Sequence, residues 1–250
     1  MVPVGRAESA RAQMLDLFPE GFEEVDHPDG VELVAYTDPS GEERLWHAFA
    51  GTASAEDVAD GWEERWREFH QPVRVGSVWI GQPWQEPPPD ALAVVIDPGR
   101  AFGTGAHATT RLCLELLIRI ERGSLLDIGC GSGVLAIAGS KLGFTPVVAL
   151  DNDEQALAAA EANARANGVE LELRYADALV DELPDAAVAV ANITRPAVEA
   201  IGRRSDCRVL VTSGYLLVDD VRIAGFDRLE RLTADGWAAD LHVRRGSRPT

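Results

Sequence analysis

A short run of glycines between an apolar strand and an apolar helix constrains the fold of this chain more than any other feature. The residues Leu-Leu-Asp-Ile at 125–128 read as a buried strand, Gly-Cys-Gly-Ser-Gly at 129–133 as a turn, and the apolar residues from Val134 onward as a helix. Glycines at such a turn let backbone amides at the helix N-terminus approach a bound nucleotide, at the carboxyl end of parallel strands. The segment therefore predicts a ligand-binding turn in an α/β domain.

Apolar runs alternate with helical segments from residue 91 onward, a pattern typical of a parallel sheet covered by helices on both faces. Strands are expected at 91–96, 125–128, 147–150, 171–175, 187–191 and 208–212, and helices at 109–121, 134–142, 154–167, 196–203 and 217–224. Two more strands, at 227–233 and 237–244, would complete the sheet as an antiparallel hairpin. The fold class predicted for residues 91–250 is a doubly wound, Rossmann-like α/β domain.

The first eighty residues lack this pattern and are expected to form a small α+β domain. A helix is expected at 7–18, strands at 31–36, 45–50, 73–75 and 78–80, and a second helix at 53–69 with Trp62 and Trp66 in the core. Four prolines occupy the segment 81–90, and proline lacks the backbone donor that a helix or a central strand needs. This segment is interpreted as a linker between the domains.

The charge of the chain is strongly negative and unevenly placed. The net charge is −18, and residues 1–90 hold 19 acidic residues against 6 arginines, a net charge of −13. Binding to DNA or RNA needs clustered basic residues that displace counterions, so a nucleic acid is not expected as a direct partner. The acidity is either a solvated surface or a surface that attracts a basic protein.

Composition also bears on compartment and metals. No run approaches the roughly 20 apolar residues of a membrane-spanning helix, and the first residues lack the basic and apolar pattern of a secretory signal. Cys113, Cys130 and Cys207 stand too far apart for a zinc knuckle or a redox pair. We therefore expect a cytoplasmic protein without a structural metal or a membrane partner. The sequence leaves the oligomeric state open.

The acidic residues beside the glycine turn indicate an adenosyl ligand. Asp151 ends the next strand, 22 residues after Gly129, where a carboxylate can bind both ribose hydroxyls. Asp127 directly precedes the turn, which favours the S-adenosylmethionine site of a methyltransferase over the dinucleotide site of a dehydrogenase. Asp127 is therefore also expected to bind the cofactor. Two further strand ends carry Asp177, expected either at the adenine amino group or in a turn, and Asn192, expected to face the crevice beside the sulfonium.

A loop rich in glycine and hydroxyl groups, at 97–110, precedes the first helix of the α/β domain. It is interpreted as a flap over the ligand, with Phe102 and Thr104 contacting the cofactor. The alternative to a functional role is that Thr109 or Thr110 merely caps the following helix. His107 has no carboxylate partner in the sequence and is interpreted as structural rather than as a general base.

Together these residues resemble the PrmA family, the methyltransferases that modify protein eleven of the large ribosomal subunit. The resemblance rests on WEERW at 62–66, PVRVG at 72–76, DPGRAFGTGAHATT at 97–110, LLDIGCGSGVLAIA at 125–138 and SGYL at 213–216. It implies a class I S-adenosylmethionine-dependent fold and a cofactor held by Thr110, Gly129, Asp151 and Asn192, with Gly131 alongside. The family usually has leucine where this chain has Thr194, and proline where it has Ala108.

The resemblance further implies methyl transfer to lysine side chains and to the N-terminal amine of the ribosomal protein, giving trimethylated products. The acidic N-terminal domain would recognise this basic protein. Asn192 is the candidate catalytic residue, expected to hold the acceptor amine near the methyl group. Two alternatives remain at this level: a methyltransferase of the same fold that acts on another protein or a small molecule, and a noncatalytic module that binds adenosyl ligands.

Overall fold

The chain forms two compact units, Met1–Arg67 and Glu68–Thr250. The computed structural model describes residues 2–3, 6, 10–11, 13–14, 17–18, 22–27, 30–35, 37, 39–49, 52–54, 71–97 and 105–246. Within these ranges no helix is both long and apolar enough to span a bilayer. The boundary at Arg67 differs from the expected domain end at residue 80 and from the expected linker at 81–90, because residues 73–90 pair and pack within the second unit.

The first unit contains a small antiparallel sheet. Its strands are β1 (Val2–Pro3), β2 (Glu23–His27) and β3 (Gly30–Val34), in the order β1-β3-β2, followed by helix α2 (Pro39–Ala48). The described residues of the expected helix at 7–18 are helical, apart from Phe18 at its end. The expected helix at 53–69, with Trp62 and Trp66, lies almost wholly outside the described residues.

The strand expected at 45–50 is wrong, since these residues belong to the end of α2 or follow it. Proline fits the first turn of a helix, and Glu42 in the first turn and His47 in the last complement the helix dipole. The partner of β3 is instead β2, a strand that the sequence analysis did not find.

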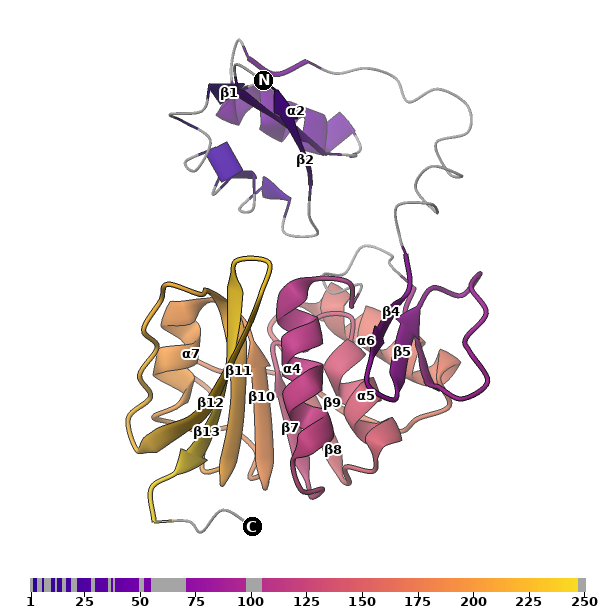
Figure 1. The fold of residues 1–250 in the computed structure, drawn as a ribbon, viewed down its shortest axis with the longest axis vertical. Coiled ribbons are helices and arrows are strands. Elements are labelled where there is room, and N and C mark those ends of the chain that lie inside the picture. The colour runs from indigo at the N-terminus through magenta and orange to yellow at the C-terminus, as the bar shows by residue number, and fades with distance from the viewer. Residues whose placement is uncertain are drawn as a thin grey trace. The chain divides into compact units, whose positions relative to one another are not determined.

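The second unit is built on a seven-stranded mixed sheet (Figure 1). Its strands are β7 (Leu125–Ile128), β8 (Val147–Asp151), β9 (Glu172–Tyr175), β10 (Val188–Asn192), β11 (Val209–Leu216), β12 (Phe226–Ala234) and β13 (Trp237–Arg244). Their order is β12-β13-β11-β10-β7-β8-β9. β11 to β9 run parallel in that order, and the β12–β13 hairpin forms the antiparallel edge, yellow in Figure 1. This confirms the α/β class and the closing hairpin.

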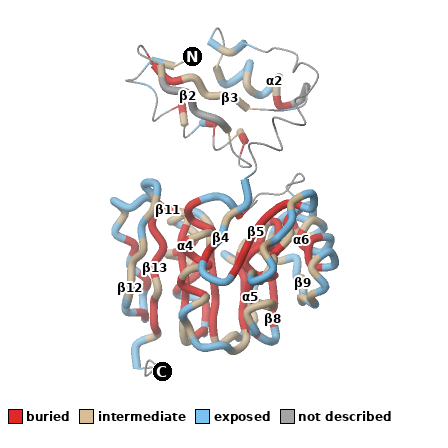
Figure 2. The backbone as a smooth tube through the Cα atoms, turned by 45° about the vertical axis from the view of Figure 1, so that its right-hand side comes forward, coloured by how far each residue is buried: buried red, intermediate tan, exposed pale blue. Residues whose placement is uncertain are grey.

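Helices cover both faces of this sheet. They are α4 (Ala108–Arg119), α5 (Val134–Leu142), α6 (Glu154–Ala166) and α7 (Arg195–Ile201). Successive side chains of a strand point to opposite faces, and along β7 Leu125 packs in the core with α4, α5 and α6, whereas Leu126 packs in the core with α7. Figure 2 shows buried residues along β8, β13 and α4 and more exposed ones along the edge strand β12.

A separate three-stranded sheet precedes α4. It consists of β4 (Val73–Val75), β5 (Val78–Gly81) and β6 (Leu92–Val95). β6 was expected in the main sheet but pairs in parallel with β5. The Asn167 side chain occupies its free edge, accepting from the Val95 amide at 2.9 Å and donating to the Val95 carbonyl at 2.6 Å. The proline-rich segment 82–90 therefore connects two strands of one sheet.

The helix expected at 217–224 is also wrong. β11 continues to Leu216, and the residues beyond it form a turn and irregular backbone. The Asp219 carboxylate accepts from the Leu216 amide at 2.9 Å, and the Asp219 amide donates to the Leu216 carbonyl at 3.0 Å. A short polar side chain that bonds nearby backbone in this way favours a turn over a helix.

Candidate functional site

The glycine turn between β7 and α5 has the backbone that its sequence requires. Gly129 adopts φ +71°, a conformation that side-chain-bearing residues rarely take. A Cβ at this position would lie 2.5 Å from Cγ2 of Ile193, so the turn also packs closely against the end of β10. The amides of Gly129 and Cys130 both donate to the Leu150 carbonyl, at 2.9 and 3.0 Å. The turn is thereby fixed against the neighbouring strand β8.

Asp151, at the end of β8, is held at the rim of this turn. Its Oδ2 accepts from the Gly131 amide at 2.9 Å, and its Oδ1 accepts from the Asp153 amide at 3.1 Å. The residue is partly exposed. A carboxylate has about four acceptor positions on its two oxygens, so each oxygen keeps capacity for a further donor. Asp151 is therefore fixed by two backbone amides and keeps free acceptor positions on both oxygens.

Asp127 lies beneath the turn and is 1% exposed. Its Oδ2 accepts from the Ala136 amide at 3.0 Å, which ties the strand to the first turn of α5. Burial raises the pKa of this carboxyl to about 7, against the opposing effect of the Ala136 hydrogen bond. The structure thus places Asp127 as a support of the turn, in contrast to the rim position of Asp151.

Replacing Asp127 by asparagine is expected to make stability less dependent on pH. The folded-state pKa of about 7 lies above the unfolded value, near 4, so the folded state binds the proton more tightly and wild-type stability falls as pH rises between these values. At about 1.4 kcal/mol per pKa unit, the free energy of unfolding of wild type should fall by roughly 3 kcal/mol relative to that of the variant between about pH 5 and about pH 8. Urea unfolding measures this difference, and parallel pH profiles would contradict it.

Asn192 and Thr110 meet although they are 82 positions apart in the sequence. Nδ2 of Asn192, at the end of β10, donates to Oγ1 of Thr110 on α4 at 3.3 Å. Thr110 is buried and Asn192 is partly exposed. β10 is the neighbour of β7 in the sheet, so this pair stands next to the glycine turn, at the same strand ends as Asp151. The structure therefore brings Gly129, Asp151, Thr110 and Asn192 to one edge of the sheet.

His107, and neither Thr109 nor Thr110, caps helix α4. Its Nδ1 accepts from the Thr109 amide at 3.4 Å and lies 2.8 Å from Thr109 Oγ1. The ring stands edge-on to Trp237, with 4.9 Å between the ring centroids. Burial, followed by the charge of Arg111, lowers the pKa of His107. These contacts agree with a structural histidine.

The structure does not place three of the residues predicted to contact the cofactor in the group described above. Asp177 forms a turn, because its Oδ1 accepts from the Leu179 amide at 2.9 Å, which is the structural alternative given above. The adenine contact of Asp177 stays a prediction. Phe102 and Thr104 lie outside the described residues. Among the residues that the structure describes, no group of three or more histidine, cysteine or acidic side chains is arranged to hold a metal ion.

Two residues of the site were not found from the sequence. Ile193 lies between the glycine turn and Gly214, and no polar or glycine signal marks it. Asn163, in the middle of α6, donates to the Ser132 carbonyl at 3.0 Å and accepts from the Asp97 amide at 3.0 Å. It thus joins the glycine turn to the start of the 97–110 loop. A buried asparagine on the apolar face of a helix was the available signal.

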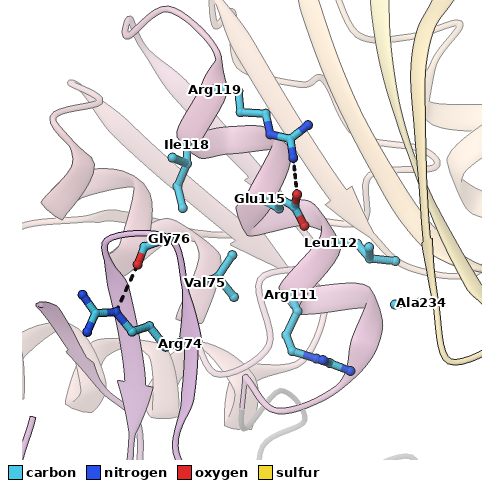
Figure 3. A pocket seen from close by; sticks show the side chains of 9 residues that line it. All are labelled: Arg74, Val75, Gly76, Arg111, Leu112, Glu115, Ile118, Arg119 and Ala234. Carbon is cyan, nitrogen blue, oxygen red and sulfur yellow. Dashed lines mark hydrogen bonds and ion pairs between the residues drawn. The ribbon is translucent and has the colours of Figure 1, made fainter.

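A groove of about 440 Å³ lies on the other side of α4 (Figure 3). Figure 3 shows Arg111 and Arg119 extending from α4 and Arg74 from β4. Each arginine has an acidic partner: Asp90 for Arg74, Asp235 for Arg111, and Glu115 with Glu230 for Arg119. The groove therefore offers little net positive charge to an anionic ligand, and the site at the strand ends is the better candidate.

Known proteins of one family are similar to this chain. A family model described as "Ribosomal protein L11 methyltransferase (PrmA)" matches residues 27–219. The ribosomal protein L11 methyltransferase of Shewanella woodyi is 44% identical over 146 residues, which are 55% of this chain and 49% of that protein. The one of Legionella pneumophila strain Philadelphia 1 is 37% identical over 203 residues, 74% of this chain and 69% of that protein. The chain spans about half the length, or slightly less, of several curated relatives that it matches.

Solved structures agree in fold. The crystal structure of ribosomal protein L11 methylase from Lactobacillus delbrueckii subsp. bulgaricus superposes with a TM-score of 0.63 at 27% identity, over 70% of this chain and 99% of that chain. A Pyrococcus abyssi tRNA (uracil-54, C5)-methyltransferase in complex with S-adenosyl-L-homocysteine, at 18% identity and a TM-score of 0.51 over 70% of this chain and 44% of that chain, shares the fold alone. The match over residues 27–219, together with the strand order and the glycine turn, shows that the chain belongs to the PrmA family of ribosomal protein L11 methyltransferases.

Proposed function

We propose that this chain transfers methyl groups from S-adenosylmethionine to amines of ribosomal protein L11, which are lysine side chains and the N-terminal amine. The main support for the proposal is the position of the Asp151 carboxylate. The Gly131 amide fixes it at the rim of the glycine turn, at the same sheet edge as Asn192. Membership of the PrmA family supports ribosomal protein L11 as the acceptor. A place of action in the cytoplasm, where this protein acceptor is made, is part of the proposal.

The residues at the sheet edge fit an adenosyl ligand. A Cβ at Gly129 would lie 2.5 Å from Cγ2 of Ile193. The glycine there would let the ligand lie directly against the backbone of the turn. Asp151 would bind the ribose hydroxyls, Gly131 would border them, and Asp177 would lie toward the adenine. S-adenosylmethionine supplies an electrophilic methyl group on a sulfonium. Thr110 and Asn192 would border this methyl-bearing end, and Phe102 and Thr104 of the 97–110 loop would cover the ligand.

The acceptor must be a neutral amine, because only an unprotonated nitrogen has the lone pair that attacks the methyl carbon. The C–N bond would form as the C–S bond breaks, with the electron pair staying on sulfur. After the first two transfers to one nitrogen the new ammonium would release a proton to solvent, whereas a third transfer would give a quaternary ammonium that keeps its charge. A free lysine has a pKa of about 10.4 and an α-amine of about 8, and partial desolvation favours the uncharged forms. Positioning of the two reactants then provides most of the rate enhancement.

Asn192 is the residue proposed to position the amine. Its Nδ2 donates to Thr110, which leaves Oδ1 as the atom that would accept a hydrogen bond from the acceptor N–H in the first two transfers to one nitrogen; a neutral dimethylamine has no N–H for a third. Such a bond directs the nitrogen lone pair toward the methyl carbon. The side chain stays uncharged, so it orients the amine without stabilising its protonated, unreactive form.

Replacement of Asn192 by alanine is expected to lower kcat about 10- to 100-fold, because a misplaced nucleophile loses much of the advantage of alignment. The Kd of S-adenosylmethionine should change less than kcat does. Single-turnover methylation of L11 with saturating cofactor measures the rate of the chemical step. A variant that keeps full turnover would remove Asn192 from the mechanism.

The acidic first unit is proposed to attract the acceptor. Residues 1–67 hold 16 acidic residues and 5 arginines, a net charge of −11. If this charge attracts a basic ribosomal protein, the KM for L11 should rise several-fold between about 0.05 and 0.5 M salt, as the Debye length shrinks from roughly 14 to 4 Å. The KM for S-adenosylmethionine should hardly change and serves as the internal control. A KM for L11 that is independent of salt would argue against this role.

The experiment that tests the proposal is intact-mass analysis of L11 after incubation with the full chain and S-adenosylmethionine. The mass should rise in steps of one methyl group, and peptide mapping should place them on lysines and the N-terminus. A basic ribosomal protein of similar size, offered in parallel, tests selectivity. Unmodified L11 beside a methylated second protein would assign another acceptor, and tight cofactor binding without any transfer would favour the noncatalytic module.

A further inference from the structure

A buried polar network crosses the three strands β11, β13 and β12 on the α7 side of the sheet. Thr212 and Asp240 are completely buried, and His242 and Tyr215 are 1% and 2% exposed. Both oxygens of Asp240 accept from Arg231, Oδ1 from Nε and Oδ2 from Nη2, each at 2.7 Å. A buried carboxylate needs such a paired, two-point partner to offset its desolvation.

The hydrogen-bond directions in this network follow from its chemistry. The Tyr215 hydroxyl lies 3.0 Å from Asp240 Oδ2 and 2.7 Å from Thr212 Oγ1. An ionised carboxylate can only accept, so Tyr215 donates to Asp240 and accepts from Thr212. Thr212 in turn accepts from Nε2 of His242 at 3.1 Å. Burial lowers the pKa of His242 to about 4, which keeps its ring neutral. Because Thr212 donates to Tyr215, its contact with His242 places the ring hydrogen on Nε2.

The same residues flank a β-bulge in β11. The register between β11 and β13 shifts between Ser213 and Tyr215, and Gly214 between them adopts φ +99°. The Tyr215 hydroxyl also lies 3.1 Å from the Thr212 carbonyl, so this side chain connects residues on either side of the bulge. Bulges that redirect a strand are common next to functional sites.

This bulge presses against the segment that carries Asn192. A Cβ on Gly214 would lie 2.0 Å from the carbonyl oxygen of Ile193, and the Ile193 amide donates to the Ser213 carbonyl at 3.2 Å. On its other side Ile193 touches the glycine turn, where its Cγ2 would lie 2.5 Å from a Cβ at Gly129. Ile193 is therefore held between the bulge and the turn, directly beside Asn192.

A second connection leads from the network to the same segment. Arg231 donates to the Asp219 carbonyl at 2.8 Å, and the Asp219 carboxylate accepts from Arg195 at 2.9 Å. Arg195 begins α7, three residues after Asn192. The network is thus connected to Ile193 through the bulge and to Arg195 through Asp219.

We propose that the Tyr215 hydroxyl, at the centre of this network, positions the segment 192–195 for methyl transfer. Tyr215 and Thr212 are positioning residues that act through Gly214 and Ile193 and touch no reacting atom. The proposal rests on the proposed function, since the aligned group is Asn192. Its physical basis is that a displacement of about 1 Å in an aligned group can cost on the order of 100-fold in rate.

The first test compares Tyr215→Phe, which keeps the ring in the core, with wild type. Methylation of L11 by Tyr215→Phe should show kcat lowered about 10-fold or more, with the Kd of S-adenosylhomocysteine changed less than about 3-fold. Thr212→Val should act in the same direction, whereas Thr212→Ser, which keeps the hydroxyl, should restore most of the rate. Val243→Ala, in β13 away from the bulge, is the control for a general loss of stability. Equal losses of kcat in Tyr215→Phe and Val243→Ala at similar Tm would overturn the proposal.

A second readout does not depend on catalysis. In protein with labelled isoleucine methyl groups, the Ile193 resonance, assigned with Ile193→Val, should shift or broaden in Tyr215→Phe, while those of Ile80 and Ile96 stay in place. If wild type transfers no methyl group to any acceptor, the proposed function fails, and the Ile193 resonance alone decides: a perturbed signal supports positioning by Tyr215. An unchanged Ile193 resonance overturns the proposal, whatever the rate does.

Discussion

Replacement of Asp151 by alanine is expected to raise the Kd of S-adenosylmethionine at least about 100-fold. Hydrogen bonds to a charged group contribute roughly 1.5 to 3 kcal/mol each, and two of them to the ribose correspond to two orders of magnitude or more. The substitution also removes the acceptor for the Gly131 amide, which Asp151 Oδ2 binds at 2.9 Å. Titration calorimetry with S-adenosylmethionine and S-adenosylhomocysteine measures the loss for both ligands.

Asp153→Ala provides the matched control for this prediction. Asp153 is an exposed aspartate two residues further on, and its Oδ1 caps α6 by accepting from the Gln155 amide at 2.8 Å. Asp151 uses only the backbone amide of Asp153, which alanine retains. The control should lose about 1 kcal/mol of stability through the missing cap and change the Kd less than about 3-fold. Equal Kd values for Asp151→Ala and wild type would show that the cofactor binds elsewhere.

Replacement of Gly214 by alanine is expected to destabilise the protein by about 2 to 5 kcal/mol. A left-handed backbone costs an alanine about 1 to 2 kcal/mol, and forcing extra atoms into a packed interior costs typically 1 to 3 kcal/mol more. Here the added Cβ would meet the backbone of Ile193, with the carbonyl oxygen at 2.0 Å and the carbonyl carbon at 2.6 Å. Backbone atoms cannot rotate away as a side chain can, so the end of β10 would have to move.

Gly225→Ala separates the two costs. Gly225 has a similar φ of +86°, but no atom lies within 4 Å of the Cβ that it would gain. This variant should lose only the conformational part, about 1 to 2 kcal/mol. Urea unfolding of both variants measures the difference in the free energy of unfolding. A Gly214→Ala variant no less stable than Gly225→Ala would contradict the close packing of the bulge on Ile193.

The elements around the glycine turn were predictable because local and tertiary preferences agree there. The strand at 125–128 and the helix at 134–142 have the predicted bounds, since a run of four mostly apolar residues is too short for a helix and glycines mark the helix ends. Asp151 followed from the same logic, as a polar residue at a strand end. The roles of Asp127 and Asp151 were not distinguished from the sequence, where both were expected to bind the cofactor. The burial of Asp127 and its bond to the Ala136 amide separate the two roles in the structure.

Other features depend on distant partners and were not predictable from local pattern. β6 is as apolar as the strands of the main sheet, and only its pairing with β5 and with Asn167 assigns it to the smaller one. The segment after β11 was expected to form a helix at 217–224, but the Asp219 carboxylate accepts from the Leu216 amide and favours a turn. Ile193 became visible as a site residue only when the bulge at Gly214 and the turn at Gly129 were seen to enclose it.

The position of the cofactor is the central claim, and a structure of the full chain with S-adenosylhomocysteine tests it most directly. The ribose hydroxyls are expected on Asp151, the nucleoside along the glycine turn at Gly129 and Gly131, and the sulfur toward Asn192 and Thr110. A nucleoside bound away from Asp151, for example in the arginine-lined groove beside α4, would contradict this assignment of the site.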